Sequence, residues 1–464
     1  QRKLKNMETD LLAEVETKIE NIQGEDPDNL EEIEKLRSEH KAVLEQICER
    51  ESAKLKTFKI LEDEKPSKGM IALEKKLSGY TNVTMLYGPE ETHSPPVQGG
   101  IPMDQSTNPK RKVLTDPKEV RKFMTKHMQN IYKHQANLTP EAEHVVSFLG
   151  SGNDQSVLNS LQSKKLTEIQ KQALEGKLSK MELETQLMKH MKNSSAPGID
   201  GFTVAWVKEF WGDLSDICVQ AVNDSFDAES LSTLLKTAIM KILRKGEKDP
   251  LEAGNYRPIS LLSVFYKMAS GAITRRLQTV IENVIGIQQK AYSKERNIGS
   301  VMINLLNLME DVNKKKMNCL ILSIDFKKAF DSIDHKFIDS CLELLNFGPQ
   351  FRRWVNLFFK NRETYLLMDG HLSEKISLEQ GVPQGDVLSP YIFNIAVEFL
   401  LMKITHTSSI EAITFAKYDC RAETYADDTT IIIKRTEENL RNLIKIIQDF
   451  SLISGLHANL DKTS

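Results

Sequence analysis

The stretch Thr424-Tyr425-Ala426-Asp427-Asp428-Thr429-Thr430-Ile431-Ile432-Ile433 decides the fold of this chain. Strand-forming residues flank two adjacent acids, which predicts a β-hairpin with Asp427 and Asp428 at its tip. Adjacent carboxylates repel each other unless a positive charge lies between them. An Asp-Asp pair is also common in ordinary turns. From this stretch alone, a plain turn and a metal-binding turn are therefore equally good interpretations.

A third aspartate follows another predicted strand. Residues 318–324 read Asn-Cys-Leu-Ile-Leu-Ser-Ile, a largely apolar run of strand length that leads into Asp325. If this strand lies beside the hairpin, Asp325, Asp427 and Asp428 share one small volume. Such carboxylates can be ionised together only around divalent cations, and all-oxygen ligands select Mg²⁺. We expect the three aspartates to be catalytic and to bind two Mg²⁺ ions about 3.5–4 Å apart, with Mn²⁺ as an alternative metal.

Length and composition set limits on the kind of protein. A chain of 464 residues indicates roughly two to four folding units. Its 40% hydrophobic and 27% charged residues are typical of soluble globular proteins. No apolar run approaches the ~18 residues of a membrane span, so we expect no membrane partner. The net charge is only −3, so composition alone does not indicate a nucleic-acid binder.

The cysteines indicate neither disulfides nor zinc. They stand far apart, without a C-x-x-C pair, at Cys48, Cys218, Cys319, Cys341 and Cys420. We interpret them as free thiols of a reducing compartment.

Patterning along the chain divides it into four regions. Residues 1–77 carry apolar residues at helical spacing and predict a coiled-coil-like helical extension, for which a solvated arm without chemistry is the simplest interpretation. Residues 78–117 are rich in Gly, Pro, Thr and Asn and predict a flexible connector. Residues 118–194 predict a helical lead-in. Residues 195–464 alternate β-branched runs with helical segments, as in an α+β domain.

Ordered sequence blocks in the last region resemble the reverse transcriptases of non-LTR (LINE-type) retrotransposons. The blocks are residues 193–202, 242–250, 255–262, 288–297, 379–390, 424–433 and 450–463. The resemblance implies the α+β fold of a right-hand polymerase, with fingers and a palm built on an antiparallel sheet with helices. The helical N-terminal extension, which apolar periodicity predicts, would precede this domain. The chain ends just after the last block, and we therefore expect it to be truncated after the palm, with the thumb absent.

The resemblance assigns nucleotide-binding roles to several residues. Arg257 would clamp the triphosphate by bidentate hydrogen bonds, with Lys245 or Lys248 adding point charge. Gln384 would hydrogen-bond the nucleotide or its template partner, and Gly385 lies in a loop whose glycines would allow close approach of the backbone to the base. Phe330 would exclude a ribose 2′-hydroxyl. Without the surrounding pattern, a core aromatic is an equally good interpretation of this phenylalanine.

Two further roles come from the same resemblance. Arg296 would contact the template, although Ala291-Tyr292 and Glu295-Arg296 depart from the usual Gly-Phe and Gly-Arg pairs of this block. Lys462 would act as a catalytic general acid toward the leaving pyrophosphate. Asp386 stands where small or hydrophobic residues are more common in the family.

The sequence thus predicts an RNA-directed DNA polymerase of a non-LTR retrotransposon. Its partners would be an RNA template, a DNA primer or target and dNTPs, and as a retroelement ribonucleoprotein it would be nuclear and cytoplasmic. Two alternatives remain open. One is a maturase-like or telomerase-like reverse transcriptase, and the other is a catalytically inactive retroelement remnant that only binds RNA.

Overall fold

A computed structural model shows a mixed α/β fold. It describes residues 83–89, 111–151, 154–246, 248–292, 296, 298–415 and 418–459, all within the compact unit Thr81–Ser464. The predicted extension 1–77 lies outside these residues. None of the helices in the described ranges is long and apolar enough to cross a membrane.

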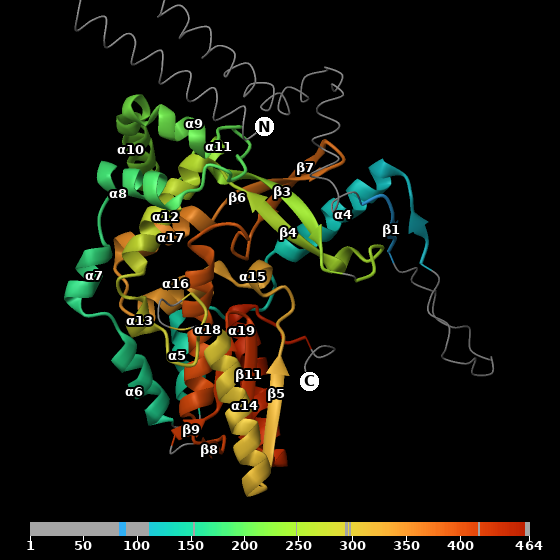
Figure 1. Ribbon diagram of the computed structural model, residues 1–464, viewed down its shortest axis with the longest axis vertical. Coiled ribbons are helices and arrows are strands. Elements are labelled where there is room, and N and C mark those ends of the chain that lie inside the picture. The colour runs from blue at the N-terminus through green and yellow to red at the C-terminus, as the bar shows by residue number, and fades with distance from the viewer. Residues whose placement is uncertain are drawn as a thin grey trace, which may run out of the picture. The chain divides into compact units, whose positions relative to one another are not determined.

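A three-stranded antiparallel sheet forms at the two stretches that the sequence singled out. Its order is β10 (Ala422–Tyr425), β11 (Asp428–Lys434) and β5 (Cys319–Ile324). Alternate residues of β11 point to opposite faces, as expected of a strand. Ile431 and Ile433 join the main hydrophobic core, whereas Ile432 packs in a smaller cluster with Leu308 of α14 (Ile298–Lys315). The sheet is therefore covered on both faces (Figure 1).

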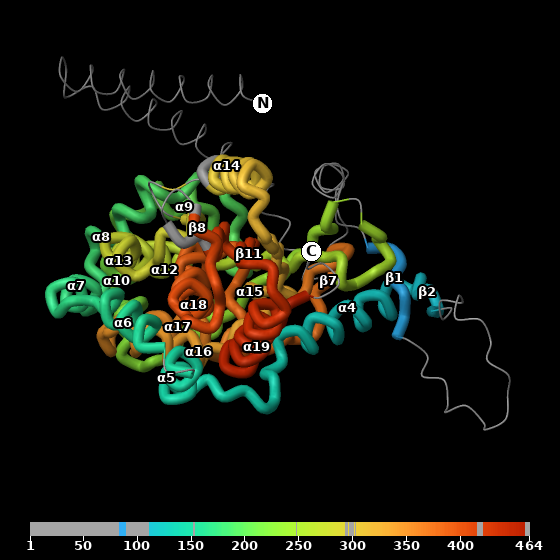
Figure 2. The backbone as a smooth tube through the Cα atoms, turned by 90° about the horizontal axis from the view of Figure 1, so that it is seen from below, coloured from blue at the N-terminus to red at the C-terminus, as the bar shows by residue number. Residues whose placement is uncertain are grey.

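A second, four-stranded sheet lies in the order β4 (Tyr256–Leu261), β3 (Thr237–Arg244), β6 (Arg362–Met368) and β7 (His371–Leu378). The β3 and β6 strands run parallel, and the other neighbours are antiparallel. The helix α4 (Pro117–Tyr132) packs against this sheet, because Met124 and Met128 on one side of the helix share a core with Met240 and Leu366 (Figures 1 and 2).

The sequence predicts a flexible connector over residues 78–117, but the structure has a short strand near each end of this segment. β1 (Leu86–Tyr87) pairs with β2 (Val113–Leu114) in an antiparallel two-stranded sheet. Leu86 is fully buried in the cluster that joins α4 to the four-stranded sheet. Burial of this leucine stabilises a pairing that the local composition does not indicate. Residues 90–110 lie outside the described residues.

The remaining elements build the main core. Several helices begin at good N-caps, among them Thr167 and Ser179, each of which forms a capping box. The helices are α5 (Ala142–Gly150), α6 (Gln155–Lys164), α7 (Glu168–Leu174), α8 (Lys180–Thr185), α9 (Val204–Glu209), α10 (Trp211–Asp227), α11 (Thr233–Lys236), α12 (Val264–Leu277), α13 (Ile281–Val284), α15 (Ala329–Ser332), α16 (His335–Leu344), α17 (Pro349–Phe359), α18 (Ser389–His406) and α19 (Glu437–Ser454). A π-helical turn (Gln186–His190), a 3₁₀ turn (Ala253–Asn255) and the pair β8 (Ile413–Phe415) and β9 (Tyr418–Cys420) complete the fold.

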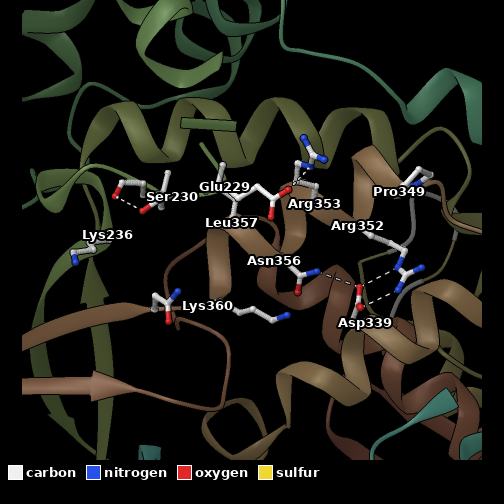
Figure 3. A pocket seen from close by; sticks show the side chains of 12 residues that line it. Glu229, Ser230, Lys236, Asp339, Pro349, Arg352, Arg353, Asn356, Leu357 and Lys360 are labelled. Carbon is white, nitrogen blue, oxygen red and sulfur yellow. Dashed lines mark hydrogen bonds and ion pairs between the residues drawn. The ribbon is translucent and has the colours of Figure 1, made fainter. Parts of the chain in front are cut away.

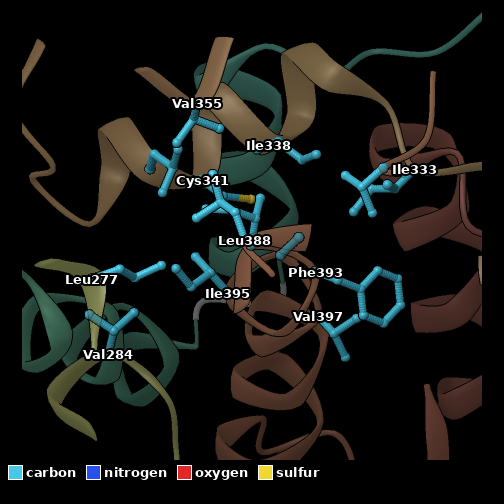
Figure 4. Close-up of a cluster of buried hydrophobic side chains, with 14 of the residues drawn as sticks. Leu277, Val284, Ile333, Ile338, Cys341, Val355, Leu388, Phe393, Ile395 and Val397 are labelled. Atoms are coloured by element: carbon cyan, nitrogen blue, oxygen red, sulfur yellow. The ribbon is translucent and has the colours of Figure 1, made fainter. Parts of the chain in front are cut away.

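The α18 helix is central to this core. It is apolar around most of its circumference, and nearly all of its residues are buried. Figure 4 shows its Phe393, Ile395 and Val397 packed among side chains of α12, α13, α16 and α17. Since α18 also contacts β10 and α19, it connects the three-stranded sheet to the helical part of the unit.

Candidate active site

The three predicted metal-binding aspartates lie at one end of the three-stranded sheet. Asp325 directly follows β5, and Asp427 and Asp428 form the turn and first residue of the β10–β11 hairpin. Ile324 pairs with Thr429, and this register puts Asp325 level with Asp428 on the neighbouring strand. Asn459 fixes Asp325 from the other side, since its Nδ2 donates to Asp325 Oδ2 at 3.0 Å and its backbone N–H donates to the Asp325 carbonyl at 2.7 Å.

The pKa of Asp427 reflects the charges around it. Burial raises the pKa of Asp427, and the negative charges of Asp428 and Asp325 raise it further, whereas Arg257 lowers it. Their oxygen-only donor set suits a hard divalent cation. In the described part of the chain, however, no three His, Cys, Asp or Glu side chains are close enough to hold a metal ion as they stand. Side-chain rotation would be needed to bring the three carboxylates onto one ion.

The predicted nucleotide-binding residues Arg257, Lys245 and Lys248 lie on the β3–β4 hairpin of the four-stranded sheet. Arg257 is exposed on β4 and acts electrostatically on Asp427. Lys245 and Lys248 line a pocket of about 630 Å³. The same pocket is lined by Phe326, which follows Asp325, and by three further lysines, Lys133, Lys327 and Lys328. The pocket therefore offers a concentrated positive charge beside the aspartates.

Lys328 is the most constrained of these lysines. It adopts a left-handed backbone conformation (φ 48°), and its Nζ lies 3.0 Å from Nε2 of His127 on α4. Burial lowers the pKa of Lys328 to about 8, and burial together with the Lys328 charge lowers the pKa of His127 to about 4. At neutral pH the imidazole is thus uncharged and accepts a hydrogen bond from the lysine.

Gln384 is held by a buried carboxylate that the sequence reasoning did not single out. Its Nε2 donates to Asp331 Oδ2 at 3.1 Å, and the hydroxyl of Tyr132 donates to Asp331 Oδ1 at 2.7 Å. Asp331 is 2% exposed, and burial raises its pKa to about 6 although Lys328 opposes the shift. The α4 helix thereby contributes to the environment of a predicted nucleotide-binding residue.

The loop around Gly385 approaches the four-stranded sheet closely. Gly385 has φ +120°, and a Cβ at this position would lie 2.7 Å from the carbonyl oxygen of Ser260 on β4. The Gln384 carbonyl also accepts from the Ser260 N–H at 2.8 Å. The structure therefore shows a close approach between two backbone segments. The predicted approach of this loop to a nucleotide base stays a prediction.

The structure accounts for the unusual Asp386. Its buried carboxylate accepts hydrogen bonds from the hydroxyls of Ser270 (2.6 Å) and Ser389 (3.3 Å). Ser389 is the first residue of α18, where the helix dipole favours a negative charge. Asp386 therefore joins α12 to the start of α18.

Phe330 is partly buried, and its ring stacks on that of Phe393 with a centroid distance of 4.4 Å. The backbone carbonyl of Phe330 accepts from the Val382 N–H at 2.7 Å, which places it against the 381–388 loop. This position is compatible both with a core aromatic and with a residue that excludes a ribose, because a ring that contacts the sugar also needs a packing partner on its other face. Its role in sugar selection stays a prediction.

Arg296 makes hydrogen bonds within the protein, and its predicted template contact stays a prediction. Its guanidinium turns inward and donates to the carbonyls of Gly286 and Gln289 and to the carboxylate of Glu282. The side chain is 17% exposed. In this arrangement its hydrogen-bond donors organise the 282–289 segment. The predicted general acid Lys462 lies outside the described residues.

Another pocket in the described part of the chain lies away from these residues. It has a volume of about 700 Å³ and contains none of the predicted site residues. Figure 3 shows that its charges are largely paired within the protein, with Arg352 bonded to Asp339 and Arg353 close to Glu229. We therefore place the candidate site at the aspartates and the lysine-lined pocket.

Comparison with known proteins shows which part of the chain resembles a known family. Residues 243–464 match the family described as reverse transcriptase (RNA-dependent DNA polymerase). The chain is 26% identical to an uncharacterized 149 kDa protein of transposon TX1 from Xenopus laevis, over 64% of this chain and 23% of that protein. It is 28% identical to the Pol polyprotein of the type-2 retrotransposable element R2DM from Drosophila melanogaster, over 58% and 24%.

The RNA-directed DNA polymerase of the mobile element jockey, also from Drosophila melanogaster, is 27% identical over 46% of this chain and 23% of that protein. The chain therefore spans about a quarter of the length of these relatives. The family match covers the aspartates, the 381–388 loop, Arg257 and Lys245, whereas Tyr132 and His127 lie upstream of it.

Proposed function

We propose that this chain copies RNA into DNA from a primer 3′-hydroxyl as part of a non-LTR retrotransposon enzyme. The match of residues 243–464 to the reverse transcriptase family supports this proposal. The names of two relatives, a retrotransposable-element polyprotein and a mobile-element polymerase, also support this proposal. In this interpretation the sheet β10–β11–β5 is the palm, and the β3–β4 hairpin belongs to the fingers.

The single observation that carries the proposal is the position of Asp325 beside the Asp427–Asp428 turn. Arg257 acts electrostatically on Asp427, and Phe326, which follows Asp325, lines the lysine-lined pocket. Phosphoryl transfer needs a site where anionic oxygens and a divalent cation meet positive charge. The aspartates have the donor chemistry for Mg²⁺. When bound, Mg²⁺ ions would activate the attacking hydroxyl and neutralise charge on the phosphates.

The remaining roles belong to side chains of this chain. Arg257, Lys245 and Lys248 would bind the triphosphate of a dNTP. Gln384, whose amide is held by Asp331, would orient the nucleotide, and Phe330 would select against a ribose. Lys462 would donate a proton to the leaving pyrophosphate. An RNA template and a DNA primer or target complete the proposed set of substrates.

Primer extension on an RNA template with dNTPs and Mg²⁺ tests the proposal. We expect extension by the wild-type chain and a loss of at least ~10²-fold in Asp427→Ala. Asp224→Ala, an exposed change on α10, serves as the matched control and should retain activity. Failure of the wild-type chain to extend a primer, with RNA binding preserved, would favour the inactive remnant.

A further inference from the structure

The turn that carries the metal-binding aspartates contains a strained residue. β10 ends at Tyr425 and β11 begins at Asp428, so the connecting turn is only Ala426 and Asp427. Ala426 has φ 58°, a left-handed conformation that costs a residue with a Cβ roughly 1 kcal/mol. Gly or Asn is the usual solution at such a position. The left-handed conformation of Ala426 must therefore be stabilised by contacts from outside the turn.

Gln289 supplies the missing support from another part of the chain. Its Oε1 accepts from the Ala426 N–H at 2.9 Å, and its Nε2 donates to the Ala426 carbonyl at 3.2 Å. The same Oε1 accepts from the Ala291 N–H at 3.0 Å. The Gln289 side chain is fully buried. Its neutral amide offers both a donor and an acceptor, and it satisfies both backbone groups of the strained residue.

The backbone around Gln289 is fixed as well. Residues 288–290 run beside β10, where the Lys290 N–H donates to the Thr424 carbonyl and the Thr424 N–H donates to the Gln288 carbonyl, both at 2.9 Å. Arg296 Nη1 donates to the Gln289 carbonyl at 2.9 Å. Arg296 Nη2 is paired with Glu282 at 2.8 Å. The amide of Gln289 therefore approaches the turn from an anchored backbone.

We propose that Gln289 is a positioning residue for the metal-binding aspartates and that Arg296 keeps Gln289 in place. The proposal rests on the proposed function in one respect, namely that Asp427 binds a divalent cation. The Ala426 carbonyl belongs to the peptide unit that leads into Asp427. Loosening this peptide would displace the Asp427 carboxylate while the pairing of β10 with β11 persists. Loss of the Gln289 hydrogen bonds should therefore weaken metal binding strongly while it lowers the melting temperature only a little.

Gln289→Met in the full 464-residue chain tests this role, because Met has a similar length but lacks the donor and the acceptor. Mn²⁺ binding is followed by the electron paramagnetic resonance signal of the free ion, and folding by thermal melting. We expect the Kd for Mn²⁺ to rise about 10-fold or more in Gln289→Met. Arg296→Met should raise it by a smaller factor, since it acts through Gln289.

Gln186→Met is the matched control. Gln186 is also a buried glutamine, but it bonds Arg275 of α12 and not the turn. We expect this control to lower the melting temperature to a similar extent without changing the Kd for Mn²⁺. A folded Gln289→Met chain with wild-type Mn²⁺ affinity, or an equal weakening in Gln186→Met, would overturn the proposal. If Gln289→Met does not fold, Arg296→Met decides, and unchanged affinity there would overturn it.

Asp427→Asn separates this proposal from the proposed function. If Asp427→Asn abolishes Mn²⁺ binding and Gln289→Met weakens it, the positioning role holds even where no primer is extended. If the wild-type chain extends primers while Gln289→Met leaves both the Kd for Mn²⁺ and the half-saturating Mg²⁺ concentration unchanged, the polymerase proposal stands and the positioning role is wrong.

Discussion

At the residue scale, the raised pKa of Asp331 predicts how the stability of the protein changes with pH. Burial raises its pKa in the folded protein to about 6, whereas an unfolded aspartate has a pKa near ~4. Between these values the folded state binds more protons than the unfolded state, so this group lowers stability as pH rises. Asp331→Asn removes the titration. From about pH 4.5 to about pH 7, the free energy of unfolding of the wild type should fall relative to that of the variant by on the order of 1–3 kcal/mol.

Urea unfolding followed by circular dichroism at the two pH values measures this difference. The charged or titratable groups that face Asp331 are Tyr132, Lys328, Lys245 and, through Lys328, His127. In the folded protein the pKa of His127 is about 4 and that of Lys328 about 8. An unfolded histidine has a pKa of about 6.5 and titrates within the window, but His127 and Lys328 are present in both proteins, so their contributions cancel in the comparison of wild type with Asp331→Asn. Asp224→Asn, an exposed change, should show no such relative shift. The same pH dependence in wild type and Asp331→Asn would contradict the prediction.

Residue-scale prediction from the sequence succeeds where an acid follows a strand. Asp325, Asp427 and Asp428 could be placed together, because strand ends are visible as apolar runs. The roles of Gln289 and Asp331 could not be read in this way. Each depends on a hydrogen bond to a residue more than a hundred positions away, and nothing near either residue indicates its partner. The inward turn of Arg296 likewise depends on carbonyl groups that only the folded backbone brings together.

At the scale of elements, the 381–388 loop connects the two parts of the candidate site. Gly385→Ala would place a Cβ 2.7 Å from the Ser260 carbonyl and would impose a side chain at φ +120°. We expect the free energy of unfolding to fall by about 1–3 kcal/mol, because backbone must shift to relieve the contact. Displacement of the adjacent Gln384 should also raise the KM for dNTP. Thermal melting and steady-state primer extension measure the two effects.

Gly254→Ala provides the control for the loop. A Cβ at Gly254 would meet no atom within 4 Å, and this glycine does not require a positive φ. The substitution should therefore leave the melting temperature nearly unchanged. Equal effects of Gly254→Ala and Gly385→Ala would show that the close approach to Ser260 does not determine stability.

Elements with strong periodicity were the most predictable from the sequence. The strands β5 and β11 lie where apolar and β-branched runs indicated them. The pair β1 and β2 was missed, because two-residue strands carry no periodicity and Leu86 is buried only by residues of α4 and the four-stranded sheet. The pairing of β3 with β6, parallel and separated by more than a hundred residues, is a long-range property of the same kind.

At the scale of the whole compact unit, the segment that matches the family does not contain its own complete core. Lys403 and Glu398 of α18 are buried, and their partners Asp154 and Lys164 lie upstream of residue 243. The hydroxyl of Ser340 on α16 donates to the carbonyl of Pro140 at 2.7 Å, and side chains of α5 and α6 fill the main core. The helices before residue 243 are thus part of the folded domain.

We therefore expect a fragment of residues 243–464 to lack a cooperative thermal transition, whereas residues 81–464 should show one. Loss of Asp154 and Lys164 leaves two buried charges without their partners, and breaking one such pair typically costs about 3–5 kcal/mol. This loss is comparable to the whole stability of many domains, about 5–15 kcal/mol. Calorimetry of both fragments tests the expectation, with amide hydrogen exchange in α18 as a local measure. If residues 243–464 unfold cooperatively at the same temperature as residues 81–464, the upstream helices are dispensable for folding. The contacts of Tyr132 and His127 with the candidate site would then not be explained by a need for α4 in the folded core.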